Sequence, residues 1–222
     1  MKKLMLAVSA CALMAGAASA EDVKIGILIG FTGPIESLTG HMANAAEAAM
    51  AEVNASGKAK NNYISVRGDD TCTDAAAATA AAERAVTAEG VKGIIGGDCS
   101  GVTRAMLTNV AMPNGIVMVS PSATSPALTT DPDDGLFFRT VPSDAREGVV
   151  MADILEARGV KSIALTYSNS DYGKGLAEAI ATAFTAKGGT VTINASHDDG
   201  KADYAAEVAA LAAAGGDVLV VA

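Results

Sequence analysis

The chain has 222 residues, which is enough for one large domain or two small ones. Half of the residues are hydrophobic but only 4% are aromatic, and alanine is abundant, which suits close-packed helices on a sheet. The formal net charge is −9. Because a nucleic-acid-binding protein needs a basic face, this charge argues against a nucleic acid partner.

The N-terminus has the pattern of a secretory signal peptide. Met1-Lys2-Lys3 is a short cationic start, Leu4 to Ala18 is uncharged and rich in apolar and small residues, and Ala18-Ser19-Ala20 is an A-x-A cleavage site. The apolar stretch is too short and too alanine-rich to span a membrane comfortably. We therefore expect residues 1–20 to be a signal peptide cleaved after Ala20, with the mature chain in the periplasm. A minor alternative is lipoprotein anchoring at Cys11, although the apolar run before that cysteine is short.

Strand and helix patterns alternate along the mature chain. Apolar or alternating runs predict strands at residues 23–29, 63–67, 91–96 and 115–120, and helical patterns predict helices at 37–56, 74–88 and 100–110. A polar loop at residues 131–135 and a short strand at 136–139 then break the rhythm. A second series follows, with helices at about 143–158, 172–186 and 204–214 and strands at 162–167, 191–195 and 218–222.

This alternation is typical of a doubly wound α/β fold with mostly parallel sheets. We expect two Rossmann-like lobes, residues 21–140 and 141–222, with a hinge near residues 139–143. The second lobe is small beside the first, and the chain stops in an apolar strand whose edge would be sticky in a complete domain. The second lobe is therefore expected to be truncated, in a piece of a longer protein.

Candidate ligand-binding residues follow the predicted strands. In open α/β sheets, ligands bind beyond the carboxyl ends of the strands, and helix starts there favour an anion through their N–H groups. The candidates are Ser37 and Leu38 after the first strand, Ser100 after the third, Ser122, Ala123 and Thr124 after the fourth, and Tyr172 in the second lobe. From position alone, the favoured role of Ser100 is an ordinary N-cap, and Ser122 and Thr124 are also compatible with a turn beside two prolines.

Motifs for cofactor chemistry or hydrolysis are missing from the sequence. It has no G-x-G-x-x-G after the first strand, no P-loop and no G-x-S-x-G elbow. Without a plausible base, the serines are expected to be hydrogen-bond donors, so we predict a protein that is not an enzyme and needs no cofactor. The histidines, His41 and His197, do not stand at a ligand-like spacing from a cysteine, so no metal site is expected. We expect Asp69 and Asp70 to be solvated loop carboxylates.

Two cysteines remain after cleavage of the signal peptide, Cys72 and Cys99. An even pair in an oxidising compartment favours a disulfide. Two free thiols, or a cysteine with a catalytic role, remain the alternatives.

Several short motifs also resemble one known family. They are Thr32-Gly33-Pro34, Asp69-Asp70-Thr71-Cys72, Gly97-Asp98-Cys99-Ser100, the run from Ser120 to Thr129, Phe138-Arg139-Thr140, and the run from Asp171 to Ala177. In this order they cover essentially the whole mature chain. The sequence thus resembles the periplasmic solute-binding proteins of branched-chain amino acid ABC transporters, the leucine/isoleucine/valine-binding family.

The resemblance implies a type I periplasmic binding fold whose two lobes close on a ligand. It implies that Cys72 and Cys99 form the family's disulfide and that Ser100 hydrogen-bonds a ligand carboxylate. The loop from Ser122 to Thr124 would contact the carboxylate and ammonium groups, and Tyr172 would close over the ligand. The family's tyrosine after Gly-Pro is replaced here by Ser37-Leu38-Thr39-Gly40, and the region with the family's acidic ammonium ligand lies beyond residue 222. Ligand identity therefore stays open between an aliphatic amino acid, an aromatic acid and another carboxylate.

The expected function is that of an extracytoplasmic solute-binding protein. It would capture an amino acid or a related small carboxylate in the cleft between the lobes and pass it to the membrane permease of an ABC importer. An alternative is the ligand-sensing ectodomain of a receptor with the same fold, which would pass closure to a signalling partner. A third class, an exported hydrolase that uses Ser100 or Ser122, would need a base that the sequence does not single out.

Overall fold

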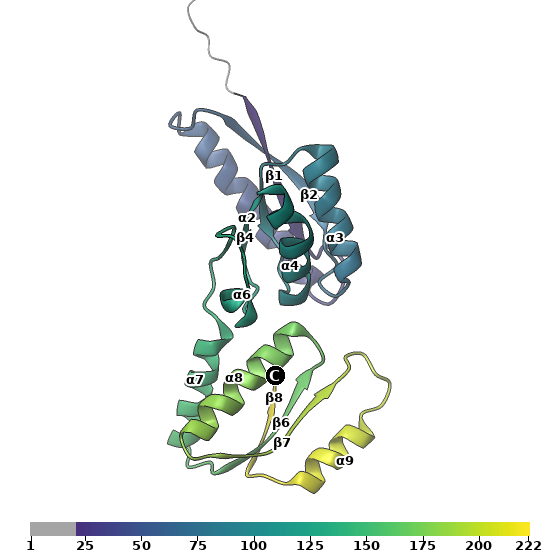
Figure 1. The fold of residues 1–222 in the computed structure, drawn as a ribbon, viewed down its shortest axis with the longest axis vertical. Helices are drawn as coiled ribbons and strands as arrows, with labels where there is room; N and C mark the ends of the chain where they lie inside the picture. Colours follow the sequence, from purple (N-terminus) through teal and green to yellow (C-terminus); the bar gives the residue numbers. More distant parts are fainter. Residues whose placement is uncertain (1–20) are drawn as a thin grey trace, which may run out of the picture.

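The computed structural model describes residues 21–222 and has two lobes, one above the other in Figure 1. The predicted signal peptide, its cleavage site and Cys11 lie outside the described residues. Each lobe is built on a parallel β-sheet with helices on its faces, which confirms the predicted fold class.

The first lobe contains a five-stranded parallel sheet in the order β2-β1-β3-β4-β5. Its strands are β1 (Asp22–Ile29), β2 (Asn62–Asp69), β3 (Gly93–Gly96), β4 (Val117–Ser120) and β5 (Phe137–Arg139). Each of the five predicted strands of this lobe is present, and each differs from its predicted bounds by a few residues at most. Because all five strands are parallel, their carboxyl ends lie at one edge of the sheet.

Helices cover both faces of this sheet. They are α2 (Glu36–Ala55), α3 (Ala75–Glu83), α4 (Ser100–Met106), α5 (Met112–Asn114) and α6 (Ala127–Thr130), with π-helical turns η1 (Arg84–Glu89) after α3 and η2 (Leu107–Ala111) after α4. Successive side chains of a strand point to opposite faces. Accordingly, Ile27 and Ile29 pack with Ala43 of α2, whereas Leu28 packs with Ala78 of α3 in the larger core cluster.

The helix predicted at residues 100–110 runs further than expected. It continues through η2 and α5 to Asn114, past the predicted stop at Pro113. The helix ends at Gly115, whose left-handed φ of 64° suits a residue without a Cβ. Glycine, rather than proline, is therefore the stop signal here.

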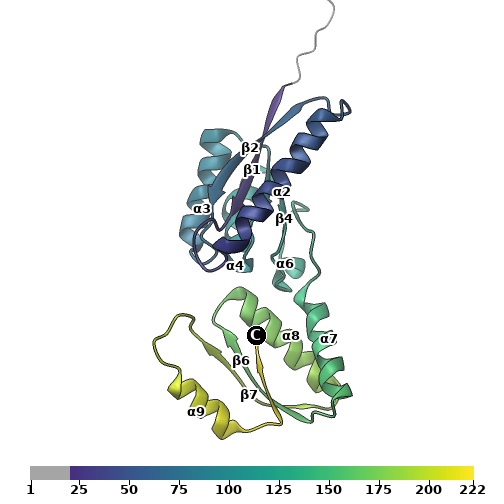
Figure 2. The same cartoon turned by 180° about the vertical axis from the view of Figure 1, so that it is seen from behind.

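The second lobe contains a three-stranded parallel sheet in the order β7-β6-β8. Its elements are α7 (Asp144–Ala157), β6 (Ser162–Ser168), α8 (Asp171–Ala186), β7 (Thr190–His197), α9 (Ala205–Ala214) and β8 (Val218–Val221). Helices α7 and α8 lie on one face of the sheet and α9 on the other (Figures 1 and 2). The core of the lobe includes Leu165, Ile180 and Phe184, all of them buried.

The segment of residues 140–143 connects the two lobes. It runs from the end of β5 to Ser143, whose hydroxyl accepts a hydrogen bond from the backbone N–H of Ala145 (3.2 Å) and so caps α7. That residues 139–143 act as a hinge stays a prediction, as do the domain limits at residues 140 and 141. Among the described helices, none is both long and apolar enough to cross a membrane.

Candidate functional site

The carboxyl edge of the first sheet faces the second lobe. Helices α2 and α4 begin at this edge, and α8 begins opposite it, at the end of β6 (Figure 1). A Cβ added to Gly101, in the first turn of α4, would lie 3.9 Å from Cβ of Asp171, the first residue of α8. The starts of two helices from different lobes therefore lie close together.

Ser100 lies buried at the start of α4, with 2% of its surface exposed. Its Oγ accepts a hydrogen bond from the backbone N–H of Ser125 (3.1 Å). The N-cap position belongs to Cys99, which makes no side-chain cap bond, so an N-cap role for Ser100 is wrong. Ser100 instead joins the start of α4 to the loop after β4.

Two serines, Ser120 and Ser122, fix the loop after β4 to the segment that precedes α4. Ser120 Oγ donates to the carbonyl of Gly97 (2.5 Å) and accepts from the N–H of Ala123 (2.9 Å), and Ser122 Oγ donates to the carbonyl of Asp98 (2.8 Å). Ala123 is 1% exposed. The Ser122 hydroxyl proton is thus committed to a backbone carbonyl.

Thr124 connects this loop to the start of α7. Its carbonyl accepts a hydrogen bond from the backbone N–H of Asp144 (3.0 Å). Asp144 is 1% exposed, and this burial raises the pKa of its carboxyl, while the Thr124 side chain and the charge of Arg139 favour its ionised form.

Tyr172 is the candidate residue of the second lobe, and 42% of its surface is exposed. It lies in the first turn of α8, where Ser170 Oγ accepts a hydrogen bond from Gly173 N–H (3.0 Å). Partial burial raises the pKa of the Tyr172 phenol, and the carboxylates of Asp144 and Glu147 raise it further. The phenol therefore keeps its proton at neutral pH and is available as a donor.

Ser37 and Leu38 are exposed in the first turn of α2, at the same edge of the sheet. Their connection to the other candidates runs through neighbours. Thr39 Oγ1 donates to the carbonyl of Gly30 (2.8 Å), and Gly30 N–H donates to the carboxylate of Asp98 (2.7 Å). Hydrogen bonds thus join the start of α4, with Ser100, to the loop that contains Ser122, Ala123 and Thr124. Ser37 and Leu38 lie at the margin of this hydrogen-bonded group.

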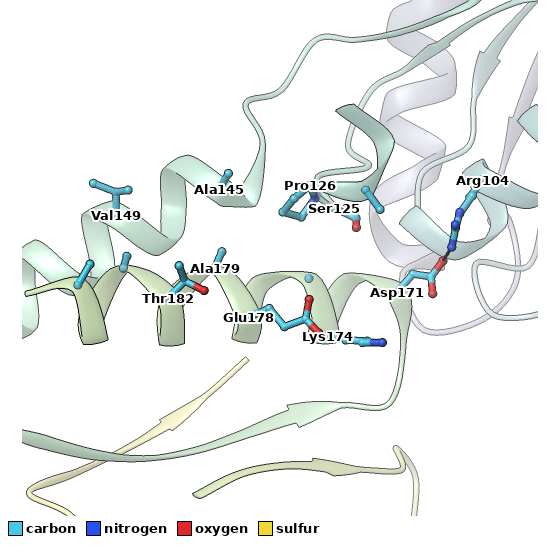
Figure 3. Close-up of a pocket in the computed structure, with 14 residues that line it drawn as sticks. Arg104, Ser125, Pro126, Ala145, Val149, Asp171, Lys174, Glu178, Ala179 and Thr182 are labelled. Carbon is cyan, nitrogen blue, oxygen red and sulfur yellow. Dashed lines mark ion pairs between the residues drawn. The ribbon is translucent and has the colours of Figure 1, made fainter. Parts of the chain in front are cut away.

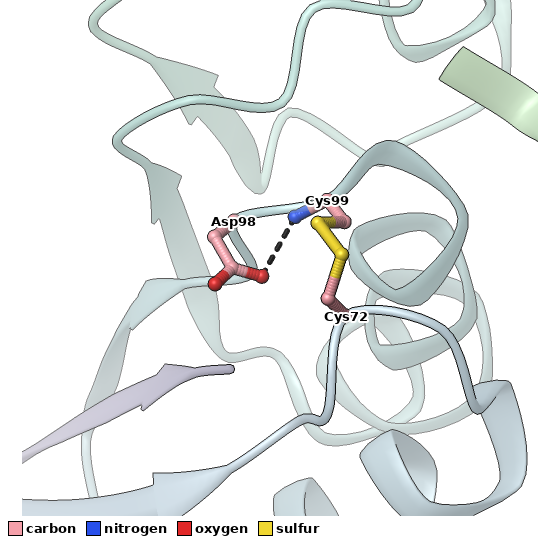
Figure 4. Close-up of side chains that lie close together, drawn as sticks. All are labelled: Cys72, Asp98 and Cys99. Atoms are coloured by element: carbon pink, nitrogen blue, oxygen red, sulfur yellow. Dashed lines mark hydrogen bonds between the residues drawn. A yellow bond between two sulfur atoms is a disulfide. The ribbon is translucent and has the colours of Figure 1, made fainter. Parts of the chain in front are cut away.

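Cys72 and Cys99 are bonded to each other, as predicted, and their Cα atoms lie 5.1 Å apart (Figure 4). The carboxylate of Asp98 lies close to both sulfur atoms. Since the two sulfur atoms are joined, neither offers a thiolate to a metal ion. The disulfide instead ties the loop after β2 to the start of α4.

Beneath this disulfide lies a pair of buried carboxyl groups, Asp70 (0% exposed) and Asp98 (3% exposed). The prediction that Asp69 and Asp70 are solvated loop carboxylates is therefore wrong for Asp70. Burial raises the pKa of Asp70 to about 8, and the neighbouring charge of Asp98 adds to this effect. The alternation of the strand could have predicted this burial. Asp70 stands two residues after the buried Gly68 of β2, so both fall on the same inward face.

Both carboxylate oxygens of Asp98 accept hydrogen bonds from backbone N–H groups. They accept from Gly30 N–H (2.7 Å) and from Cys99 N–H (2.8 Å, Figure 4). Asp70 accepts from Cys72 N–H (2.9 Å) through one oxygen, and its other oxygen has no partner in the described chain. These bonds fix the ends of β1, β2 and β3 relative to one another.

Arg104 of α4 carries ion pairs that sequence reasoning missed. Its Nε lies 2.7 Å from Asp131 in the first lobe. Its Nη1 lies 3.7 Å from Asp171 in the second lobe, a pair that Figure 3 shows. Nothing in a helical pattern marks such a residue, because its partners come from a distant loop and from the other lobe.

A groove of about 520 Å³ runs beside this contact, between α8 and the first lobe. Its lining includes Arg104, Ser125, Pro126, Val149 and Lys174, so both lobes contribute (Figure 3). The groove contains none of the seven residues predicted to bind ligand. We therefore place the candidate site at the sheet edge, because the hydrogen-bonded group lies there.

Comparisons with known proteins give the same family. A family model described as periplasmic binding protein matches residues 22–222. The Leu/Ile/Val-binding protein homolog 3 of Brucella melitensis biotype 1 is 31% identical over 219 residues, which cover 98% of this chain and 59% of that protein.

Solved structures share the fold. The branched-chain amino acid transporter substrate binding protein LivJ from Streptococcus pneumoniae, in complex with isoleucine, matches with a TM-score of 0.75 and 26% identity over 90% of this chain and 57% of that chain. A solute-binding protein of an ABC transporter from R. palustris, in complex with 4-hydroxybenzoate, has a TM-score of 0.79 at 19% identity and covers 91% of this chain and 54% of its own.

The chain thus spans less than two thirds of the length of each of these proteins. The family match nevertheless covers the described residues from β1 to the end of β8. It agrees with the resemblance that the motifs indicated. The chain belongs to the periplasmic binding protein family.

Proposed function

We propose that the protein is an exported solute-binding protein that holds an amino acid or a related small carboxylate between its lobes and delivers it to the permease of an ABC importer. The observation that carries this proposal is the hydrogen-bonded group of Ser100, Ser122 and Thr124 at the carboxyl edge of the first sheet, opposite Tyr172. This edge is where ligands of open α/β sheets bind.

The start of α4 supplies a site for the ligand carboxylate. The first N–H groups of a helix have no intrahelical acceptor, and the helix dipole favours negative charge there. Ser100 Oγ accepts from Ser125 N–H, so its own proton is available for donation to a carboxylate oxygen. We propose that Ser100 and the Thr124 segment bind the carboxylate, and that Ser122 and Ala123 support them.

Tyr172 contributes from the second lobe. Its neutral phenol is partly exposed and lies near the start of α7, so it is suited to cover a ligand held by the first lobe. Ligand contacts to both lobes would favour the closed arrangement, as in a shift between open and closed populations. Ser37 and Leu38 would line the rim of the cleft.

No catalytic step is included in the proposal. The Ser122 hydroxyl donates a hydrogen bond to the Asp98 carbonyl. Nδ1 of His197 shares a hydrogen bond with Thr166 Oγ1 (2.8 Å) within the second lobe. A serine nucleophile needs an adjacent base within hydrogen-bond reach. The family itself consists of binding proteins.

Export to the periplasm is part of the proposal. The A-x-A pattern ending at Ala20 supports cleavage there. The Cys72–Cys99 disulfide fits an oxidising compartment.

An aliphatic amino acid is the favoured ligand. LivJ, at 26% identity, was solved with isoleucine, and the Brucella relative is named for leucine, isoleucine and valine. The R. palustris neighbour shares only the fold at 19% identity, so its 4-hydroxybenzoate is a weaker guide. Both ligands carry the carboxylate that the α4 start would hold.

Calorimetric titration of the protein with L-leucine, L-isoleucine, L-valine and 4-hydroxybenzoate tests this proposal. We expect saturable binding of at least one aliphatic amino acid at one site, and recovery of that ligand unchanged after prolonged incubation. Binding of 4-hydroxybenzoate alone would move the proposal to aromatic acids. Failure of all four ligands to bind would overturn it, and chemical turnover of a bound ligand would favour an enzyme.

A further inference from the structure

The connection between the lobes is bonded directly to the loop that carries the proposed ligand contacts. Three consecutive carbonyls of this loop accept hydrogen bonds from two residues at the ends of the connection. Arg139 Nη1 donates to the carbonyls of Ala123 (3.3 Å) and Ser125 (3.0 Å), and Asp144 N–H donates to the carbonyl of Thr124 (3.0 Å).

The opposite side of the same loop is held by the first lobe. Ala123 N–H donates to Ser120 Oγ (2.9 Å) and Ser125 N–H donates to Ser100 Oγ (3.1 Å). In the described chain, the N–H of Thr124 is the one backbone donor of the three without a protein acceptor. The loop is therefore fixed on two sides around a single available donor.

Arginine suits this task because its guanidinium is planar and carries several donors. A second arm of Arg139, Nη2, donates to the hydroxyl of Thr129, which orients the group. Lysine would bring the same charge, but a single ammonium on a flexible stem does not match three acceptors in fixed positions.

We propose that Arg139 and Asp144 are positioning residues for the ligand. They hold residues 123–125 from the connection about which the lobes would turn, so the orientation of Thr124 depends on the position of that connection. This inference rests on the proposed function, and it links ligand binding to lobe movement through five residues.

The first test compares Arg139→Lys with Arg146→Lys. Arg146 is an exposed arginine on α7 and serves as the matched control. In the ligand-free protein, we expect Arg139→Lys to speed hydrogen exchange at the amides of Ala123 and Ser125, while amides of β1 and β3 stay as in the parent. With L-isoleucine as the probe, we expect affinity to fall by roughly tenfold, as for loss of a hydrogen bond from a charged donor.

The second test isolates one hydrogen bond. Asp144 is the first residue of α7, a position that tolerates proline, and Asp144→Pro deletes the N–H that Thr124 accepts. Asp144→Ala loses the same carboxylate but keeps that N–H. We expect faster exchange at Ser125 and weaker binding of L-isoleucine in the proline variant than in the alanine variant.

A third variant, Thr129→Val, separates positioning from direct contact with the ligand. It removes the hydroxyl that orients the guanidinium but leaves the Arg139 charge in place. We expect a smaller loss of affinity in the same direction as Arg139→Lys. Unchanged affinity in Thr129→Val beside a loss in Arg139→Lys would indicate a direct ligand contact and overturn the positioning role.

The outcomes also separate this inference from the proposed function. Unchanged exchange in Arg139→Lys and in Asp144→Pro would overturn the inference, whether or not L-isoleucine binds. Altered exchange with parental affinity would show that the connection holds the loop but does not position the ligand, which also overturns it. If the parent protein binds none of the four ligands, the proposed function fails and the ligand-positioning role fails with it, whatever the exchange data show about the loop.

Discussion

At the scale of single residues, we expect the buried carboxyl groups of Asp70 and Asp98 to carry one negative charge between them at neutral pH. Asp98 accepts hydrogen bonds from two backbone donors, whereas one oxygen of Asp70 has no donor in the described chain. Two like charges side by side in a buried site raise the pKa of one member, here that of Asp70. The proton therefore belongs to Asp70 in the folded protein at neutral pH.

This proton predicts a pH dependence of stability. The pKa of Asp70 is about 8 in the folded protein and about 4 in an unfolded chain, so the folded state binds more protons between these values. The contribution of Asp70 is complete below about pH 4, decreases as pH rises towards 8, and is constant above that. We expect the free energy of unfolding to lose a few kcal/mol over this range through this group, as measured by urea unfolding at pH 5, 6.5 and 8.

The matched comparison is between Asp70→Asn and Asp134→Asn, the latter in an exposed loop. Asparagine cannot ionise, so Asp70→Asn should flatten the decrease between pH 5 and 8, and Asp134→Asn should not. An equal slope in all three proteins would show that Asp70 does not hold the proton.

Ser100→Ala tests the functional prediction at the same scale. The substitution removes the acceptor of Ser125 N–H and the proposed donor to the ligand carboxylate. We expect L-isoleucine binding to weaken by roughly tenfold and stability to fall by about 1–3 kcal/mol, because a buried donor loses its partner. Ser65→Ala, an exposed serine on β2, is the control. If Ser100→Ala binds L-isoleucine as tightly as the parent protein does, Ser100 does not contact the ligand.

At the scale of elements, hydrophobic periodicity predicted every strand and the main helices. Periodicity did not predict where the helix that begins with α4 ends, nor which distant groups the polar side chains bond. The π-helical turn η2 carries its helix past Pro113, and Ser100 bonds a loop 25 residues away rather than its own helix. Arg139 stands in one of the family motifs, but its role could not be predicted, because it bonds the backbone of a loop whose position depends on the whole lobe.

The disulfide joins two such elements, the loop after β2 and the start of α4. The two cysteines are 27 residues apart, and closing a loop of this length stabilises the folded state by about 3–4 kcal/mol in the chain-entropy account. We expect a reductant to lower the urea concentration at which the first lobe is half unfolded. Unfolding is monitored by circular dichroism, because the chain has no tryptophan. The double variant Cys72→Ser/Cys99→Ser should unfold at the lower midpoint with or without reductant. An unchanged urea midpoint of the parent protein after complete reduction of the disulfide would contradict this prediction.

At the scale of the whole molecule, the lobes touch at a few defined points. A Cβ on Gly175 of α8 would lie 2.9 Å from Pro126 Cδ, so the absence of a side chain lets the first lobe rest on this helix. Beside it, Arg104 reaches Asp171 across the boundary. These contacts join the two lobes.

Arg104→Gln should therefore shift the lobes towards separation. Both partners are about half exposed, so the pair contributes at most about 1 kcal/mol, which corresponds to a change of up to about fivefold in the ratio of open to closed protein. The measurement is the distribution of distances between spin labels placed on the two lobes, in the ligand-free protein. Arg158→Gln, which removes an exposed arginine at the end of α7, is the control. High salt should mimic the effect in the parent protein but not in Arg104→Gln.

If the lobes close on a ligand as proposed, the groove beside Arg104 would allow the protein to serve as an optical sensor. Its walls come from both lobes, so its width changes with any rotation about residues 140–143. Lys174 lies in the groove wall on α8 and outside the proposed ligand set (Figure 3). Within residues 21–222 the two cysteines are bonded to each other, so Lys174→Cys would offer a single reactive thiol there for an environment-sensitive dye. Ligand uptake would then be read as a change in fluorescence, with no label in the cleft itself.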